Sequence, residues 1–145
     1  MDISTFIGDV KLKIRVVGIV RTSRGFLFEK SDGDYIFVIG GKVSISETLE
    51  ESIKREMMEE IGMRVNKLTL CSVVENLYGT DQNKVHEISF VYKIDNVFTG
   101  DIPEGFLEVS MENLDKFDIR PGSIVELLKN KDDSFKYIIV NEWKD

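Results

Sequence analysis

The chain has 145 residues, 42% hydrophobic and 31% charged, a balance typical of a globular protein, and we expect one domain over residues 1–145. Its net charge of −7, single cysteine and single histidine argue against non-specific nucleic-acid binding, an internal disulfide and a histidine-based zinc cluster. Neither a membrane span nor a signal peptide is predicted, so we expect a cytoplasmic protein.

The N-terminal half is predicted to hold strands followed by one helix. Runs of β-branched and aromatic residues predict three strands, at residues 11–22, 26–30 and 35–39. The third strand is expected to end at Gly40–Gly41. A helix is predicted over 48–61 because apolar residues recur every four positions, at Leu49, Ile53, Met57 and Ile61. It is expected to begin at Ser46 or at a capping box starting with Thr48, and to end at Gly62.

The C-terminal half is predicted to return to strands and to close with a second helix. The expected elements are strands at 68–77 and 85–97 around a turn at 79–83, a loop at 99–104, a strand at 106–110, a helical turn at 112–117, a helix at 122–129 and a strand at 137–140. Strands on both sides of one helix, with another helix near the end, predict an α+β fold. In it, a mixed sheet packs between helices as an α/β/α sandwich.

Three acidic residues of the first helix lie close to its apolar stripe. At 100° per residue, Glu56, Glu59 and Glu60 fall in an arc of about 100° that overlaps one edge of that stripe. Like charges at this spacing repel, and a carboxylate beside the core loses hydration. A bound divalent cation such as Mg²⁺ removes both costs. The alternative is a solvated acidic face that Lys54 and Arg55 partly neutralise.

The helix and the residues before it carry a motif with fixed spacing. Gly41 is followed after five residues by Glu47, and after seven more by the run Arg55–Met63, REMMEEIGM. Seven fixed identities at average usage arise by chance on the order of 10⁻⁸ per start position. The pattern resembles the Nudix box, and the chain is identified as similar to small bacterial MutT-like Nudix proteins. One departure is Ile39, where family members commonly have proline before two glycines.

The resemblance implies hydrolysis of a pyrophosphate linkage in a nucleoside diphosphate joined to another group, with Mg²⁺ or Mn²⁺ as cofactor. It carries over as metal-binding and catalytic groups Glu56, Glu59 and Glu60, with the main-chain carbonyl of Gly40. Glu56 is either a further ligand or the general base. The resemblance also implies that Glu47 and Arg55 form an internal pair that holds the loop and the helix in register.

Residues outside the acidic triplet complete the predicted site. The resemblance implies that one more acidic residue, Glu87 or Glu104, supplies a metal ligand or a base, and the alternative for each is a plain surface carboxylate. Glu87 shares a strand face with Ser89. Substrate-binding roles are predicted for four residues, Arg15, Gly41, Lys42 and Tyr78. For the basic residues the alternative is solvated surface, and for Tyr78 it is packing in the core.

Three classes of function remain open on the sequence. The first is an active diphosphohydrolase acting on a small-molecule nucleotide, and the second is a nucleotide sensor that has kept the fold and lost catalysis. The third, a purely structural domain, leaves the acidic triplet unexplained. Family members use nucleoside triphosphates, dinucleoside polyphosphates, nucleotide sugars, ADP-ribose and capped RNA. No pattern in the sequence selects among these substrates or indicates an oligomeric state.

Overall fold

The computed structural model describes residues 1–130 and 134–143. Its strands are β1 (Ser4–Ile7), β2 (Val10–Arg21), β3 (Phe26–Lys30), β4 (Tyr35–Lys42), β5 (Leu68–Tyr78), β6 (Lys84–Ile94), β7 (Phe106–Val109), β8 (Asp118–Arg120) and β9 (Lys136–Asn141). Its helices are α1 (Leu49–Ile61), the 3₁₀ helix η1 (Met111–Lys116) and α2 (Ile124–Lys129). Among the described residues, no helix combines the length and the apolar character that crossing a bilayer requires.

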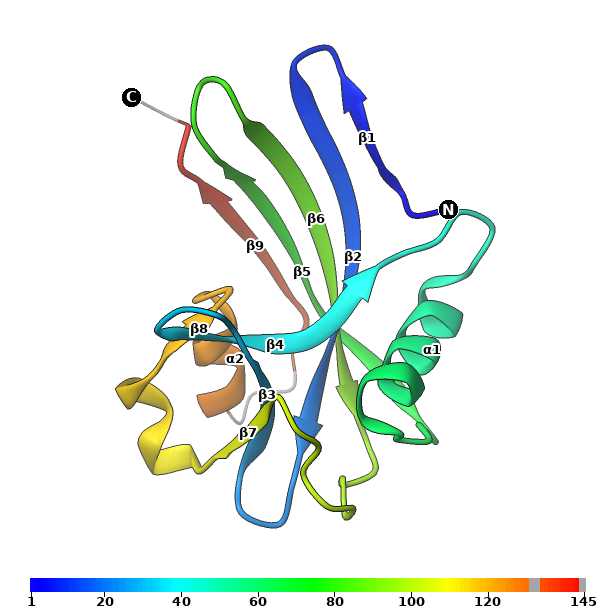
Figure 1. Cartoon of the computed structure of the whole chain (residues 1–145), viewed down its shortest axis with the longest axis vertical. Helices are drawn as coiled ribbons and strands as arrows, with labels where there is room; N and C mark the ends of the chain where they lie inside the picture. Colours follow the sequence, from blue (N-terminus) through cyan, green and yellow to red (C-terminus); the bar gives the residue numbers. More distant parts are fainter. Residues whose placement is uncertain (131–133, 144–145) are drawn as a thin grey trace.

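The strands form one mixed sheet in the order β7-β3-β4-β2-β6-β5-β9, with β1 paired to β2 and β8 paired to β4. Three neighbouring pairs are parallel, namely β2 with β6, β4 with β8 and β5 with β9, and the others are antiparallel. Figure 1 shows β4 crossing from beside β8 to the long strands. The predicted mixed sheet is confirmed.

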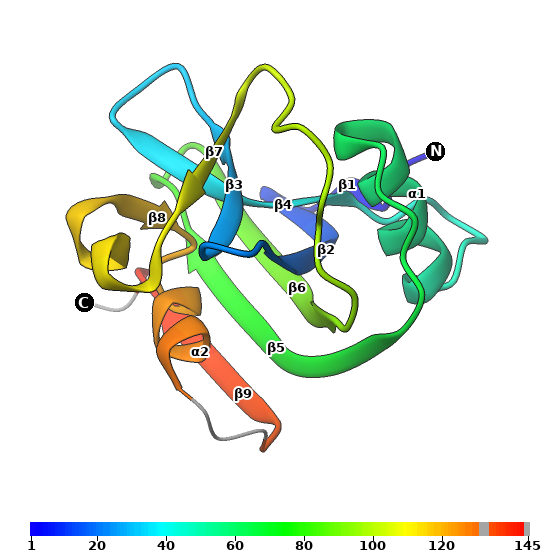
Figure 2. The same cartoon turned by 90° about the horizontal axis from the view of Figure 1, so that it is seen from below.

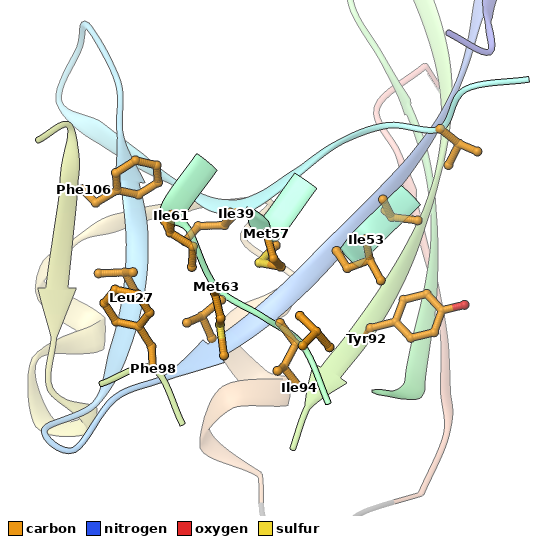
Figure 3. Close-up of a cluster of buried hydrophobic side chains, with 14 residues drawn as sticks. Leu27, Ile39, Ile53, Met57, Ile61, Met63, Tyr92, Ile94, Phe98 and Phe106 are labelled. Atoms are coloured by element: carbon orange, nitrogen blue, oxygen red, sulfur yellow. The ribbon is translucent and has the colours of Figure 1, made fainter. Parts of the chain in front are cut away.

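The helices cover opposite faces of this sheet, as the alternation of side chains along β2 shows. Val16 and Val20 belong to the buried cluster that includes Ile53 and Met57 of α1 (Figure 3). The intervening residues, Val17 and Ile19, belong to a second cluster with side chains from η1, β8 and α2. Figures 1 and 2 show α1 and α2 on opposite sides of the central strands, which confirms the predicted α/β/α arrangement.

Both ends of α1 are defined by local chemistry. The hydroxyl of Thr48 accepts a hydrogen bond from the backbone N–H of Glu51 at 3.1 Å, so of the two predicted starts Thr48 is confirmed as the cap and Ser46 is not the cap. The helix ends at Gly62, whose φ of 64° is the left-handed conformation that glycine adopts without strain. These caps fix which side chains of α1 face the sheet.

Two strands were missed, and two predicted strands end at the wrong residue. β1 and β8 were not predicted, because one is a short exposed strand and the other has three residues. The strand predicted over 35–39 runs on through Gly40–Gly41 to Lys42, because Val17 and Val16 of β2 pair with these glycines. The strand predicted over 85–97 ends at Ile94.

Candidate active site

The first part of the site is the contact between α1 and the glycines of β4. The Glu56 side chain lies against Gly41, where a Cβ would come within 2.4 Å of the Glu56 carboxyl carbon. Glu56 is 8% exposed, and this burial raises the pKa of its carboxyl group, partly offset by Arg55 and reinforced by Glu59 and Glu60. A glycine at position 41 thus provides the space for a carboxylate at the margin of the core.

Arg55 connects three of the acidic residues that the motif singles out. Its Nε and Nη2 donate to the two carboxylate oxygens of Glu47 at 2.8 and 3.0 Å, which is a bidentate ion pair. Its Nη1 donates to Glu56 at 3.0 Å and to Glu59 at 3.3 Å. Hydrogen bonds from Arg55 and Ser52 lower the pKa of Glu47 to about 2. The guanidinium group therefore joins the loop before α1 to the helix and to its acidic face.

Glu60 carries charge that Arg55 does not neutralise. Its pKa is raised by partial burial, then by the nearby carboxylates of Glu29 and Glu59. In residues 1–130 and 134–143, no basic side chain forms an ion pair with Glu60. Glu29 was not predicted as a site residue; it lies on β3, where Phe37 and Phe106 are its cross-strand partners. The pairing that brings β3 to α1 is not visible from local sequence.

The acidic residues of α1 do not form a complete ligand shell as they stand. Glu59 is held by Arg55 and its side chain is 58% exposed, whereas Glu56 is buried. Nowhere in the described part of the chain do three acidic, histidine or cysteine side chains gather closely enough to hold a metal ion. Metal binding by Glu56, Glu59, Glu60 and the Gly40 carbonyl therefore stays a prediction.

The second part of the site is a cavity of about 700 Å³ on the other face of the sheet. This volume lies within the range of pockets for small molecules. Its walls come from β2, β4, β5, β6, β8 and β9 and from the segment after β8; the lining residues are Arg15, Val17, Phe37, Val38, Asn76, Tyr78, Glu87, Ser89, Asp118, Ile119, Arg120, Pro121, Gly122, Ser123, Val140 and Glu142. Two of the residues predicted to bind substrate, Arg15 and Tyr78, are among them.

Glu87 lies in this cavity and is held by its neighbours. Its two carboxylate oxygens accept hydrogen bonds from the Tyr78 hydroxyl at 3.2 Å and the Ser89 hydroxyl at 3.3 Å. Burial, followed by the effect of Glu87, raises the pKa of Tyr78 to about 12. Glu87 alternates along β6 with Phe90 and Tyr92, which pack on the α1 side. It therefore projects from the face opposite α1, and its predicted role as a metal ligand stays a prediction.

A row of basic residues borders the cavity on β2 and β4. Arg15 is the cross-strand partner of Lys42, so their side chains leave the same face of the sheet. The side chain of Lys13, two residues before Arg15, projects from the same face, and Lys13 is the cross-strand partner of Glu87. Burial lowers the pKa of Lys13; Glu87 opposes this shift, whereas Lys11, Lys42 and Arg15 add to it. Lys13 was not predicted as a site residue, although its alternation with Arg15 is visible in the sequence.

Three further residues need placing. Glu104, the alternative to Glu87, is exposed in the loop before β7, next to Gly105, whose carbonyl accepts from the Lys30 N–H. Its predicted role stays a prediction. Asn76 and Ser123 line the cavity and were not predicted to have a role. Ser123 comes to the cavity through the pairing of β8 with β4, which no local pattern indicates.

Comparison with known proteins agrees with this architecture. The sequence profile described as the NUDIX domain matches residues 11–133. The MutT protein from Bacillus halodurans is similar in structure, with a TM-score of 0.69, 20% identity and 86% of each chain covered.

Two other solved structures share the fold at similar identity. A MutT NUDIX hydrolase from Burkholderia pseudomallei has a TM-score of 0.67 and 19% identity, covering 82% of this chain and 98% of that one. A NUDIX hydrolase from Nitrosomonas europaea has a TM-score of 0.64 and 19% identity, covering 95% and 82%. With the box of residues 41–63 and the family match over most of its length, the chain belongs to the Nudix hydrolase family.

Proposed function

We propose that the protein is a metal-dependent hydrolase of a pyrophosphate linkage in a nucleoside diphosphate joined to another group, and that the whole chain acts as one domain. The observation that carries this proposal is the buried Glu56 carboxylate in the space left by Gly41. Burying a carboxylate costs stability. Carboxylates whose pKa is raised in this way cluster at functional sites. Membership of the Nudix family supplies the reaction class.

The residues present fit a divalent cation such as Mg²⁺ or Mn²⁺. Hard cations prefer carboxylate and carbonyl oxygens, which Glu56, Glu59, Glu60 and the main chain at Gly40 offer. Arg55 neutralises only part of this charge, and the nearby carboxylate of Glu29 adds negative charge beside Glu60. When bound, such a cation neutralises phosphate charge and lowers the pKa of a bound water.

The other residues of the site position the groups that react. The bidentate pair of Arg55 with Glu47 fixes the loop that follows β4 against α1. Arg15, Lys13 and Lys42 form the basic row where we place the phosphates of the substrate, close to Gly41 in the β2–β4 pairing. Glu56 is a ligand or the general base. The backbone at Gly41 and the Tyr78 hydroxyl are proposed to border the substrate.

We leave Glu87 out of the proposed metal ligands. Its carboxylate already accepts two hydrogen bonds within the cavity, from the hydroxyl groups of Tyr78 and Ser89. Glu104 stays open as the additional acidic group, because it lies in an exposed loop that leads into the strand paired with β3. Loss of Mn²⁺ affinity in Glu104→Gln, with retention in Glu87→Gln, is the result expected if Glu104 has this role.

The proposal is tested by a hydrolysis screen with Mg²⁺ or Mn²⁺ over nucleoside triphosphates, dinucleoside polyphosphates, nucleotide sugars and ADP-ribose. We expect cleavage at a phosphoanhydride bond, identified by the mass of the products. Glu59→Gln and Glu60→Gln are expected to lower kcat by about two or more orders of magnitude. This is the size of effect seen when an enzyme loses one group that stabilises charge in the transition state.

Glu51→Gln is the matched control, because Glu51 is an exposed acid of the same helix outside the acidic triplet. It should keep wild-type activity and Mn²⁺ affinity. Folded, metal-loaded wild-type protein that cleaves none of these classes, while still binding one of them, would contradict the hydrolase proposal. That result would leave the nucleotide sensor as the function.

A further inference from the structure

We propose that the outer edge of β9 binds a second copy of this chain, with the two β9 strands pairing antiparallel about a two-fold axis at Ile139. The inference goes beyond the proposed function, because it concerns an edge of the sheet and not the reaction. β9 ends the sheet beside β5, and in the described part of the chain no strand pairs with its other edge (Figure 1). Such an edge offers backbone N–H and C=O groups to another strand.

Two contacts to β5 fix β9 and show which of its backbone groups face outward. The N–H of Glu142 donates to the carbonyl of Leu77 at 2.8 Å, and the carbonyl of Lys136 accepts from the Ser72 hydroxyl at 2.8 Å. Backbone groups of successive residues in a strand point to opposite edges, so those of the odd-numbered residues of β9 face away from β5. The edge that a second strand would meet is therefore held in place at both of its ends.

The odd-numbered residues also carry an exposed apolar stripe. Phe135, Tyr137 and Ile139 are 53%, 60% and 61% exposed. Alternate residues of a strand project from the same face, so these side chains are neighbours. The Tyr137 hydroxyl donates to the carboxylate of Glu75 on β5, which holds the tyrosine ring against the sheet. Adjacent exposed apolar side chains of this kind mark surfaces that contact another molecule.

The charges at the two ends of β9 favour pairing of the strand with itself. With the axis at Ile139, Lys136 of each copy lies opposite Glu142 of the other copy, so two pairs of opposite charge form. Both residues are even-numbered and project from the cavity face, where Glu142 lines the cavity wall. Opposite charges on cross-strand partners stabilise a strand pair. The edge is therefore self-complementary, as a two-fold interface requires.

The same register brings apolar side chains together on the other face. Ile139 lies opposite Ile139 of the second copy, and Phe135 lies opposite Trp143 of the second copy. Trp143 is fixed near the end of β9, because its indole N–H donates to the carbonyl of Tyr78 at 2.8 Å. Aromatic and β-branched cross-strand pairs are favourable, so this register matches both the charges and the apolar groups.

β1 also lies at an edge of the sheet, and its charges argue against pairing with itself. Two β1 strands paired antiparallel about their centre would bring Asp2 of one copy opposite Asp9 of the other, and like charges on opposing residues repel. β1 has four residues, compared with six in β9. Its exposed Phe6 already has the Lys11 ammonium group over its ring at 5.9 Å. The charge pattern therefore favours β9.

The test measures the mass of the full-length protein by sedimentation equilibrium at concentrations from about 1 to 100 μM. We expect monomers at the lower end and dimers at the upper end, because pairing through one strand forms a small interface. Ile139→Lys places two like charges at the axis and should give monomers throughout. Ile45→Lys is the matched control, since Ile45 is 62% exposed in the loop after β4, and it should dimerise like the wild type.

Charge reversal tests the register. Lys136→Glu and Glu142→Lys should each raise the dissociation constant by about tenfold, because each places like charges opposite one another. The double variant should restore dimerisation, since both charges are reversed. Lys30→Glu controls for the change in net charge, because Lys30 is exposed at the end of β3, far from β9 in the strand order.

Three results would overturn the inference. The first is a wild-type protein that stays monomeric at about 100 μM, where a small specific interface should form. The second is a dimer that Ile45→Lys dissociates and Ile139→Lys does not. The third is a double charge-reversal variant that dimerises no better than either single variant. Urea unfolding of each variant confirms that a loss of dimer is not a loss of fold.

Discussion

The carboxyl group of Glu56 and the missing side chain of Gly41 share one space, since a Cβ on residue 41 would lie 2.4 Å from the Glu56 carboxyl carbon. The next glycine is constrained differently. A Cβ on Gly40 would lie 2.1 Å from the carbonyl oxygen of Val16, which is backbone of the neighbouring strand. Two adjacent glycines thus serve two purposes, one for the site and one for the sheet.

Gly41→Ala is expected to displace the Glu56 carboxyl group while the fold persists, because the end of a flexible side chain can move. Mn²⁺ affinity should fall by about tenfold or more, as when groups that orient metal ligands are lost. The free energy of unfolding should change by less than about 1 kcal/mol. Calorimetric titration with Mn²⁺ and urea unfolding of the same sample measure both quantities.

Gly40→Ala is expected to act on stability instead. The new methyl group meets backbone that cannot rotate away, so the β2–β4 pairing must shift, at a cost of about 1–3 kcal/mol. Urea unfolding checks this result. If Gly40→Ala is as stable as the wild type while Gly41→Ala unfolds, the assignment of the two glycines is reversed.

The ion pair of Glu47 with Arg55 predicts a pH dependence of stability. Arg55 and Ser52 lower the pKa of Glu47 from about 4.5 to about 2 in the folded protein. A carboxyl group with a lowered folded pKa stabilises the fold above its unfolded pKa, and this contribution is lost as the pH falls. The stability difference between wild type and Glu47→Gln should be constant above about pH 5 and shrink from pH 4.5 toward pH 2. Urea unfolding at a series of pH values tests this, and a difference that does not change with pH would contradict it.

Glu60→Gln should stabilise the metal-free protein. The pKa of Glu60 is raised, so its charged form destabilises the fold at neutral pH. Removing like-charge repulsion on one helix gives about 0.2–0.5 kcal/mol per pair. The same variant should lose most of the rise in Tm that Mn²⁺ produces in the wild type. Thermal unfolding with Mn²⁺ and with EDTA separates the two effects, with Glu51→Gln unchanged in both.

The two adjacent methionines of α1 test which face of the helix carries the packing. Met57 is 0% exposed and packs in the cluster of Figure 3, whereas Met58 is 49% exposed. Met57→Ala should cost about 2–5 kcal/mol of unfolding free energy, and Met58→Ala less than about 0.5 kcal/mol. Denaturant unfolding of both variants checks the contrast. Similar losses for the two would mean that α1 is rotated.

Much of α1 was predictable because its signals are local. The four-residue spacing of Leu49, Ile53, Met57 and Ile61 gives the buried face, and Thr48 and Gly62 mark the ends. The alternation of Glu87 with its neighbours on β6 was equally visible in the sequence. Which face of β6 meets α1 was not, because that depends on the pairing of β6 with β2 and of β2 with β4.

Two of the missed residues, Glu29 and Ser123, share this cause. Glu29 approaches Glu60 only because β3 pairs with β4, and Ser123 reaches the cavity only because β8 pairs in parallel with β4. β8 itself has three residues, too few for a pattern. The continuation of β4 through Gly40–Gly41 could not be predicted, because two consecutive glycines usually mark the end of a strand. Here the backbone of β2 leaves no room for a side chain at Gly40, and the Glu56 carboxyl group occupies that space at Gly41.

The register of β4 against β2 determines the orientation of residues in both parts of the site. Gly41 opposite Val16 faces the acidic helix, and the next residue, Lys42 opposite Arg15, faces the cavity. A slip of one residue would reverse both orientations, placing an amine against Glu56 and leaving the phosphate end of the cavity with one cation fewer. An insertion or deletion in the turn between β3 and β4 that shifted this register would therefore abolish the site even in a chain that folds.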